Sequence, residues 1–246
     1  MRKRTQARAV STVVGLLMAC AAAGQTPAAK PRYLVHRARA PMAIDARVDE
    51  KEWAAASPAI EFIFPWDSQT GAKQKTRARL LWDDEYLYVA YECEDADITA
   101  QFRDRDDPVY RDDTVEIFLN VEPSQLLAYY GIEINVLGAI NDYVCTGSQF
   151  YFKRFDMEGL KTGIRTDGTV NMRGDADRGW TVELAIPWRN FEDMSPPPKV
   201  GTVFTANLNR WDGIEPNRRL SLWSDSKLNW PHPHAPENFG ELVFVN

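Results

Sequence analysis

Apolar and polar side chains alternate along most of this chain after residue 75, which is the period of a β-strand with one buried face. The runs that alternate or are rich in β-branched and aromatic residues are 76–82, 86–93, 114–120, 129–138, 179–187, 203–211 and 240–245. Short polar segments, such as WDDEY at 82–86 and SPPPKVG at 195–201, separate them and are typical of turns. Helical pattern is confined to short pieces near VDEKEWAAA and PWRNF. The pattern predicts an all-β fold, an antiparallel, jelly-roll-like β-sandwich with short helical pieces.

The first residues have a different character and predict an export signal. Residues 1–19 begin with four positive charges and no acid, and continue into an apolar stretch too short to span a bilayer. LMAC, ending at Cys20, is similar to a bacterial lipobox, whose cysteine is acylated after cleavage. We favour a lipoprotein, with a soluble periplasmic or secreted product as the alternative, because the alanines after Cys20 also suit ordinary signal peptidase. Residues 20–40 are then expected to form a flexible tether.

Residues 41–246 are predicted to form one domain, since no second composition and no solenoid repeat interrupts them. Loss of residues 1–19 removes four positive charges and no acid, so the formal charge of −6 becomes −10. Such an acidic domain repels phosphate, which argues against nucleic acid and anionic membrane surfaces as partners. Membrane contact is expected only through the lipid anchor. Cys93 and Cys145 either pair or remain separate buried thiols.

Three of the predicted strands carry carboxylates and amides on the face opposite their apolar residues. The residues expected in the core are Val115, Ile117, Leu119, Ile132, Ile134, Val136, Phe204, Ala206 and Leu208. The opposite faces carry Glu116, Glu133, Asn135 and Asn207. A solvated sheet face explains such polarity without a ligand, but asparagine is a poor strand former. A cluster of short acceptors and amides is what sugar hydroxyls require, because each hydroxyl both donates and accepts.

Sugar binding also requires flat aromatic surfaces for the C–H faces of the ring. We expect Trp53, Trp82, Trp180 and Trp188 to fill the core. Trp230 differs because three prolines follow it within six residues, at 231, 233 and 236, and exclude regular helix there. A tryptophan on such a loop is expected to be exposed. Tyr110 lies in a comparable loop, DDPVYRDD, just before the strand that carries Glu116.

Six segments in order give the chain a family resemblance: MAIDARVDEKEWAAA, TRARLLWDDEYLYVAYECED, YRDDTVEIFLN, YYGIEINVLGAIND, GWTVELAIPW and PENFGELVF. Over residues 41–246 this succession resembles the family 9 carbohydrate-binding modules. The resemblance implies an antiparallel β-sandwich in which two aromatic rings clamp a terminal sugar, commonly the reducing end of a glucan or xylan chain. The matching residues are the clamp pair Tyr110 and Trp230 and the hydrogen-bonding set Glu116, Glu133, Asn135 and Asn207. Tyr110 is a smaller platform than the tryptophan of other members, and Glu133 in place of a basic residue leaves the identity of the sugar open.

Metal binding is an alternative at two places. The acidic stretch at 95–113 offers oxygen ligands for structural calcium, which family members can carry, but no loop motif with fixed ligand spacing is present. A solvated acidic loop is favoured there. Zinc bound by His232 and His234 would need two further ligands, so we expect these histidines to line the rim beside Trp230.

Three other functions were weighed against sugar binding. Relatives of this sandwich bind haem b through histidine and methionine or lysine, but Met157, Met172 and Met194 lack apolar surroundings in the sequence. Glu116 and Glu133 on neighbouring strands could serve a glycoside hydrolase as its carboxyl pair. Exposed aromatics could instead contact another protein as a scaffold. We favour non-catalytic binding of an oligo- or polysaccharide, alone or beside a partner glycoside hydrolase.

Overall fold

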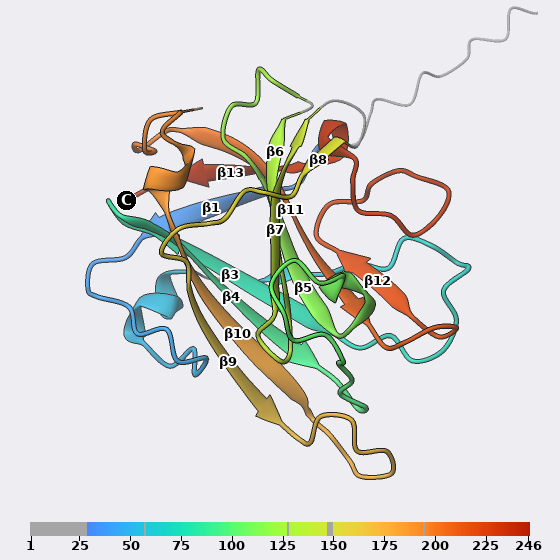
Figure 1. Ribbon diagram of the computed structural model, residues 1–246. Helices are drawn as coiled ribbons and strands as arrows, with labels where there is room; N and C mark the ends of the chain where they lie inside the picture. Colours follow the sequence, from blue (N-terminus) through green and yellow to red (C-terminus); the bar gives the residue numbers. More distant parts are fainter. Residues whose placement is uncertain (1–28, 57, 127, 147–149, 194) are drawn as a thin grey trace, which may run out of the picture.

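The structure is a computed structural model that describes residues 29–56, 58–126, 128–146, 150–193 and 195–246 (Figure 1). The predicted signal segment and Cys20 lie outside these residues. All regular structure in the described part is β-strand or short 3-10 helix, which confirms the all-β prediction. None of the helices there is long or apolar enough to cross a lipid bilayer.

Thirteen strands form one curled sheet. They are β1 (Arg32–Arg37), β2 (Ile60–Glu61), β3 (Thr76–Trp82), β4 (Tyr86–Glu94), β5 (Thr114–Asn120), β6 (Tyr129–Asn135), β7 (Ile140–Thr146), β8 (Phe150–Phe152), β9 (Lys161–Asp167), β10 (Gly179–Pro187), β11 (Val203–Asp212), β12 (Arg219–Leu222) and β13 (Gly240–Phe244). The 3-10 helices are η1 (Lys51–Ala55), η2 (Val109–Arg111), η3 (Trp188–Phe191) and η4 (Pro236–Asn238). The strand order is β8-β7-β6-β5-β11-β13-β1-β3-β4-β10-β9, with β12 on β11 and β2 on β3.

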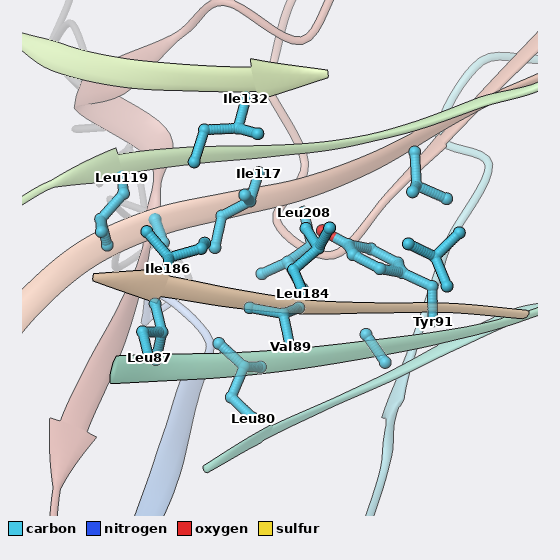
Figure 2. Close-up of a cluster of buried hydrophobic side chains, with 14 of the residues drawn as sticks. Leu80, Leu87, Val89, Tyr91, Ile117, Leu119, Ile132, Leu184, Ile186 and Leu208 are labelled. Carbon is cyan, nitrogen blue, oxygen red and sulfur yellow. The ribbon is translucent and has the colours of Figure 1, made fainter. Parts of the chain in front are cut away.

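The curl brings the two halves of the sheet face to face, as in a sandwich. Side chains of β5, β6 and β11 meet those of β3, β4 and β10 across the core (Figure 2). All the core positions expected on 114–120, 129–138 and 203–211 belong to this cluster, because alternation sends every second residue to the same side. The four tryptophans expected inside are also buried. The Tyr91 hydroxyl donates to the Glu116 carbonyl at 2.9 Å and so ties the two halves together.

β1 corrects two expectations from the sequence. It runs parallel to both β13 and β3, so the sheet is mixed rather than purely antiparallel. It also lies within residues 20–40, which were expected to be a tether, although Tyr33 and Val35 are buried in the core. The segment RYLVHR has only two inward-facing apolar residues between charged ends. Its pairing partners are far away in sequence, so the local pattern did not reveal it.

A buried carboxylate fixes the segment that precedes η1 on the outer face of β10. Both oxygens of Glu183 accept hydrogen bonds, from the amides of Asp45 and Ala46 at 2.9 and 2.8 Å and from Trp53 Nε1 at 3.1 Å. Gly163 lies opposite Glu183, and a Cβ atom there would come within 2.8 Å of the Ile44 carbonyl oxygen. The glycine therefore lets this segment pack against the sheet.

A second buried polar group, here called the Arg210 cluster, contains Arg210, Asp95, Asp113 and Asp212. Arg210 Nη2 lies 2.9 Å from Asp95 and 2.7 Å from Asp212, and its Nη1 donates to the Glu94 carbonyl at 2.7 Å. Asp113 accepts from the amides of Thr99 and Gly213. The three acids approach one another within 4.8 Å, which is the geometry of a cation site, and a guanidinium already supplies positive charge there. Burial raises the pKa of Asp113 to about 8.

Candidate functional site

A row of polar side chains crosses four adjacent strands on the side of the sheet away from the core. Strand register places Asn209 of β11 opposite Glu116 of β5, Glu116 opposite Glu133 of β6, and Glu133 opposite Asn141 of β7. None of the four is more than 3% exposed. The alternative of a solvated face therefore does not hold at this row, because other segments of the chain cover it.

The covering segments enclose a pocket of about 380 Å³ above the row. Its walls come from η2, from β8 and the residue after it, from the end of β11, and from the proline-rich segment before η4. The lining residues are Tyr110, Glu116, Glu133, Asn141, Tyr143, Tyr151, Lys153, Trp211, Arg218, Pro231, His232, Pro233 and His234. Because the two carboxyls lie at the base of a partly enclosed pocket, they are shielded from bulk water.

Glu133 is held rigidly by two neutral donors. Asn141 Nδ2 donates to one carboxylate oxygen at 2.8 Å, and the Tyr143 hydroxyl donates to the other at 2.9 Å. Gly131 makes the second bond feasible, since it lies opposite Tyr143 and a Cβ atom there would stand 2.3 Å from the ring. The side chain of Tyr143 can therefore lie over Gly131, because the glycine has no side chain in the way.

Glu116 is less well satisfied than its neighbour. Its Oε2 is buried and has no hydrogen-bond partner among the described residues. Burial, reinforced by the charge of Glu133, raises the pKa of Glu116 well above its usual value. Burial also raises the pKa of Glu133, but the bonds from Asn141 and Tyr143 oppose that rise. Glu116 is therefore the carboxyl of the pair that more readily keeps a proton.

Arg218 lines the pocket and is oriented by aromatic rings. Its guanidinium carbon lies 3.6 Å from the centroid of Trp211 and 5.7 Å from that of Tyr110. Its Nε and Nη2 are buried, and the described part of the chain offers them no hydrogen-bond partner. Burial lowers the pKa of Arg218, although it remains a cation at neutral pH because an arginine pKa starts so high.

The two histidines lie in the wall and are neutral. The His234 ring stacks on Phe118 at 4.5 Å between centroids, and its Nδ1 lies 2.6 Å from the Tyr129 hydroxyl. Burial lowers the pKa of His234 to about 3. His232 Nδ1 is buried and, within the described residues, has no partner. Among those same residues, the Arg210 cluster is the one group of acids, histidines or cysteines close enough together to hold a metal, so the histidines form no zinc site there.

The structure brings four of the six predicted binding residues together. Tyr110, Glu116 and Glu133 line the pocket. Trp230 is 57% exposed, directly precedes the lining residue Pro231, and has its ring centroid 6.3 Å from that of His232. Its indole is thus available to solvent beside the pocket.

The other two predicted residues, Asn135 and Asn207, lie outside the pocket wall and bond to the backbone. The Asn135 amide group donates to the Phe102 carbonyl and to Asp112, and its oxygen accepts from the amides of residues 137 and 139. Asn207 exchanges two hydrogen bonds with the backbone of Ser224, both 2.9 Å long. Their polar groups hold loops in place and are not directed at a ligand.

Sequence reasoning missed Asn141, Tyr143, Trp211 and Arg218. The first two were recoverable, because Asn141 and Tyr143 alternate on the strand that follows Glu133 through a short turn. Trp211 shares the face of Asn207 on its strand by alternation, but that pattern alone indicates no role for it. No local pattern distinguishes Arg218 within the loop DGIEPNRR. The two other cysteines, Cys93 and Cys145, are both buried and form no disulfide.

Comparison with known proteins agrees with this architecture. Residues 44–246 match the model of the carbohydrate family 9 binding domain-like family. Endo-1,4-beta-xylanases A of Thermotoga neapolitana and Thermotoga maritima are 26% and 27% identical over 172 and 175 residues. Those alignments cover 69% of this chain and 14% of each xylanase.

Solved structures show the same fold. One from Bacteroides uniformis has a TM-score of 0.72 at 17% identity, covering 88% of this chain and all of that one. A family 9 carbohydrate-binding module of Caldicellulosiruptor kristjanssonii, solved with cellotriose, has a TM-score of 0.62 at 20% identity and covers 87% of this chain and 94% of that one. At these identities the likeness concerns the fold alone.

Proposed function

Because the chain belongs to the carbohydrate family 9 binding domain-like family, we propose that its pocket binds a terminal sugar of a glucan- or xylan-type oligosaccharide without cleaving it. One observation carries the proposal: five buried polar atoms that lack partners among the described residues belong to side chains lining this single pocket. They are Glu116 Oε2, Asn141 Oδ1, Arg218 Nε, Arg218 Nη2 and His232 Nδ1.

These atoms suit hydroxyl groups. Glu116 and Asn141 present acceptors, and Arg218 presents donors, so a ligand must both donate and accept. Leaving a buried polar group unpaired costs about 1–3 kcal/mol, which makes the set expensive unless a ligand or water completes it. Sugar hydroxyls supply both roles from adjacent carbons.

Stacking surfaces complete the proposed site. Tyr110 lines the pocket, and Trp230 stands exposed beside it, on the stretch that Pro231 and Pro233 stiffen. Arg218 already covers one face of Trp211, so that indole acts as a support for the guanidinium. We therefore assign sugar stacking to Tyr110 and Trp230.

Hydrolysis is less well supported than binding. A glycosidase needs two carboxyl groups free to act on the scissile bond. Both oxygens of Glu133 are engaged by Asn141 and Tyr143, which leaves Glu116 alone with a free oxygen. Met157, a candidate haem ligand, is buried in the core, Met172 is on the surface and Met194 lies outside the described residues, so haem binding gains no support either.

The relatives favour glucan or xylan as the ligand. The Caldicellulosiruptor kristjanssonii module was solved with cellotriose and with glucose, and the curated relatives are xylanases of which this chain spans about a seventh. A partner glycoside hydrolase is therefore part of the proposal. Export and lipid anchoring through Cys20 rest on the sequence of residues 1–20.

Calorimetry on the purified domain tests the proposal. Glucose, cellobiose and xylobiose should bind with Kd of about 1 µM to 1 mM, or about −8 to −4 kcal/mol. E116Q and N141A should weaken binding, whereas E92Q, on the outer face of β4, should not. An assay for new reducing ends should stay negative. No binding of any of these sugars, or sugar release by the parent that E116Q abolishes, would contradict the proposal.

A further inference from the structure

Arginines in this protein repeatedly use one edge of the guanidinium, formed by Nε and Nη2, to bind a carboxylate. Arg32 places these atoms 2.9 and 2.6 Å from Glu241, and Arg219 places them 3.2 and 2.9 Å from Asp212. Arg178 uses the same edge on both oxygens of Asp167. On Arg218, this edge is buried and has no partner in the described part of the chain.

The open edge is held ready for a ligand. The guanidinium carbon lies 3.6 Å from the centroid of Trp211 and 5.7 Å from that of Tyr110, so the two rings restrict the orientation of the Arg218 side chain. A planar guanidinium with a fixed orientation matches a carboxylate by two parallel hydrogen bonds, which a hydroxyl cannot reproduce. The pre-set orientation lowers the entropy cost of forming them.

The charges around the pocket favour an anion. Lys153 is a second cation in the wall, and among the described residues it forms no ion pair. Of the two acids, Glu133 is satisfied by neutral donors, and the raised pKa of Glu116 favours its neutral form. The two cations thus face less than two full negative charges.

A neighbouring hollow extends this positive field. It has a volume of about 760 Å³ and shares Tyr110 and Arg218 with the pocket. Arg111 and Arg173 line it together with one exposed acid, Glu215, while its other acid, Asp112, is buried and bonded to Asn135. An anionic group entering from this side meets an excess of positive charge.

We propose that the preferred ligand is a sugar that carries a carboxylate, and that Arg218 binds this carboxylate through Nε and Nη2. This inference rests on the proposed function and specifies its ligand class. Two sources share the chemistry: a hexuronic acid, with the carboxylate at C6, and an aldonic acid, with the carboxylate at the oxidised C1.

The test is calorimetry at pH 7 with three ligands of similar size: glucose, glucuronate and gluconate. The parent protein should bind one of the two acids at least tenfold more tightly than glucose, and the preferred acid identifies the source. R218Q should abolish that preference while changing glucose affinity less. R178Q removes an exposed arginine away from the pocket and should keep the preference. Melting curves establish that the variants are folded.

The outcomes separate the two proposals. Equal binding of glucose and both acids by the parent overturns the carboxylate inference and leaves sugar binding intact. Binding of none of the sugars overturns both. If R218Q does not fold, R218K takes its place, because it keeps the positive charge but lacks the paired Nε and Nη2 donors. An undiminished acid preference in R218K would count against Arg218 as the carboxylate ligand.

Discussion

Two buried polar groups in this protein contain the same kinds of residue but differ in how completely their polar atoms are hydrogen-bonded. The Arg210 cluster and the pocket each contain an arginine that contacts a tryptophan ring, with carboxylates nearby. In the Arg210 cluster both terminal nitrogens of the guanidinium are bonded, to Asp95, Asp212, Thr76 and the Glu94 carbonyl, and of its nitrogens Nε alone has no partner among the described residues. In the pocket, Arg218 and Glu116 keep open positions.

The difference separates a structural role from a binding role. Removing one partner of a buried ion pair destabilises the folded protein severely, because the other charge remains buried. A buried group that is left open already costs stability, and the cost is recovered only when a ligand arrives. Substitutions in the Arg210 cluster should therefore act mainly on folding, and substitutions in the pocket mainly on binding.

The largest expected effect comes from R210M. Removing the guanidinium leaves Asp95 and Asp113 without their buried cation and Asp212 with Arg219 alone, so the free energy of unfolding should fall by about 3–5 kcal/mol. Urea denaturation measures it, with the exposed R178M as the matched control. A loss no larger than that of the control would mean that the cluster does not stabilise the fold.

G131A should have the next largest effect and act on both properties. Its Cβ atom would meet the Tyr143 ring, so the tyrosine must move and its hydrogen bond to Glu133 should break. We expect a loss of about 1–3 kcal/mol in stability, as for an overpacked core, together with weaker sugar binding. Chemical denaturation and calorimetry measure the two. G201A, where the Cβ position is open but the φ of +91° strains an alanine, sets an upper limit for the cost of a methyl group added without a clash. Unchanged binding in G131A would show that Tyr143 does not orient Glu133 for the ligand.

W230A should affect binding and leave folding almost unchanged. The indole is mostly exposed, so its removal should weaken sugar binding about tenfold, or about 1.4 kcal/mol, with little change in Tm. Calorimetry and a melting curve measure the two quantities, with W53A as the contrasting core variant. A large fall in Tm for W230A would assign Trp230 a structural role.

The smallest expected effect is the pH dependence of E116Q. Because the folded state raises the pKa of Glu116, that state holds the proton more tightly, and stability should fall as pH rises above about 4.5. Glutamine removes this penalty, so E116Q should match the parent at pH 4 and exceed it by up to about 1 kcal/mol at pH 8. Urea denaturation across this range, with E61Q as the exposed control, checks the sign. A difference that does not vary with pH would contradict the assignment.

The sequence predicted those parts of the molecule that depend on local alternation. Ile117 and Ile132 go inward because their neighbours point outward, and the same rule placed Glu116 and Glu133 on one face. Trp230 was expected to be exposed because the prolines around it prevent helix, and its side chain is exposed.

The remainder of the site depends on contacts between distant segments. Whether a polar face is solvated depends on what folds over it, and the cover here comes partly from residues 231–234, about a hundred positions from Glu133. Asparagine is a residue type that often binds ligands, but Asn135 and Asn207 instead form hydrogen bonds with the backbone of nearby loops. Arg218 comes close to Trp211 because the chain turns back between β11 and β12. Alternation along one strand carries no information about these contacts.

The parallel pairing of β1 with β13 decides how this domain can be joined to another protein. The two strands start side by side, with Arg32 opposite Glu241, and end side by side, so the polypeptide enters at one end of the pair and leaves at the other (Figure 1). Residues 29–31 lie against Trp223, Ser224 and Asp225, at the base of the segment that carries Trp230. A fusion partner or surface attachment placed before Arg32 would therefore join the domain at the end of the pair near that segment, whereas one placed after Asn246 would join it at the opposite end.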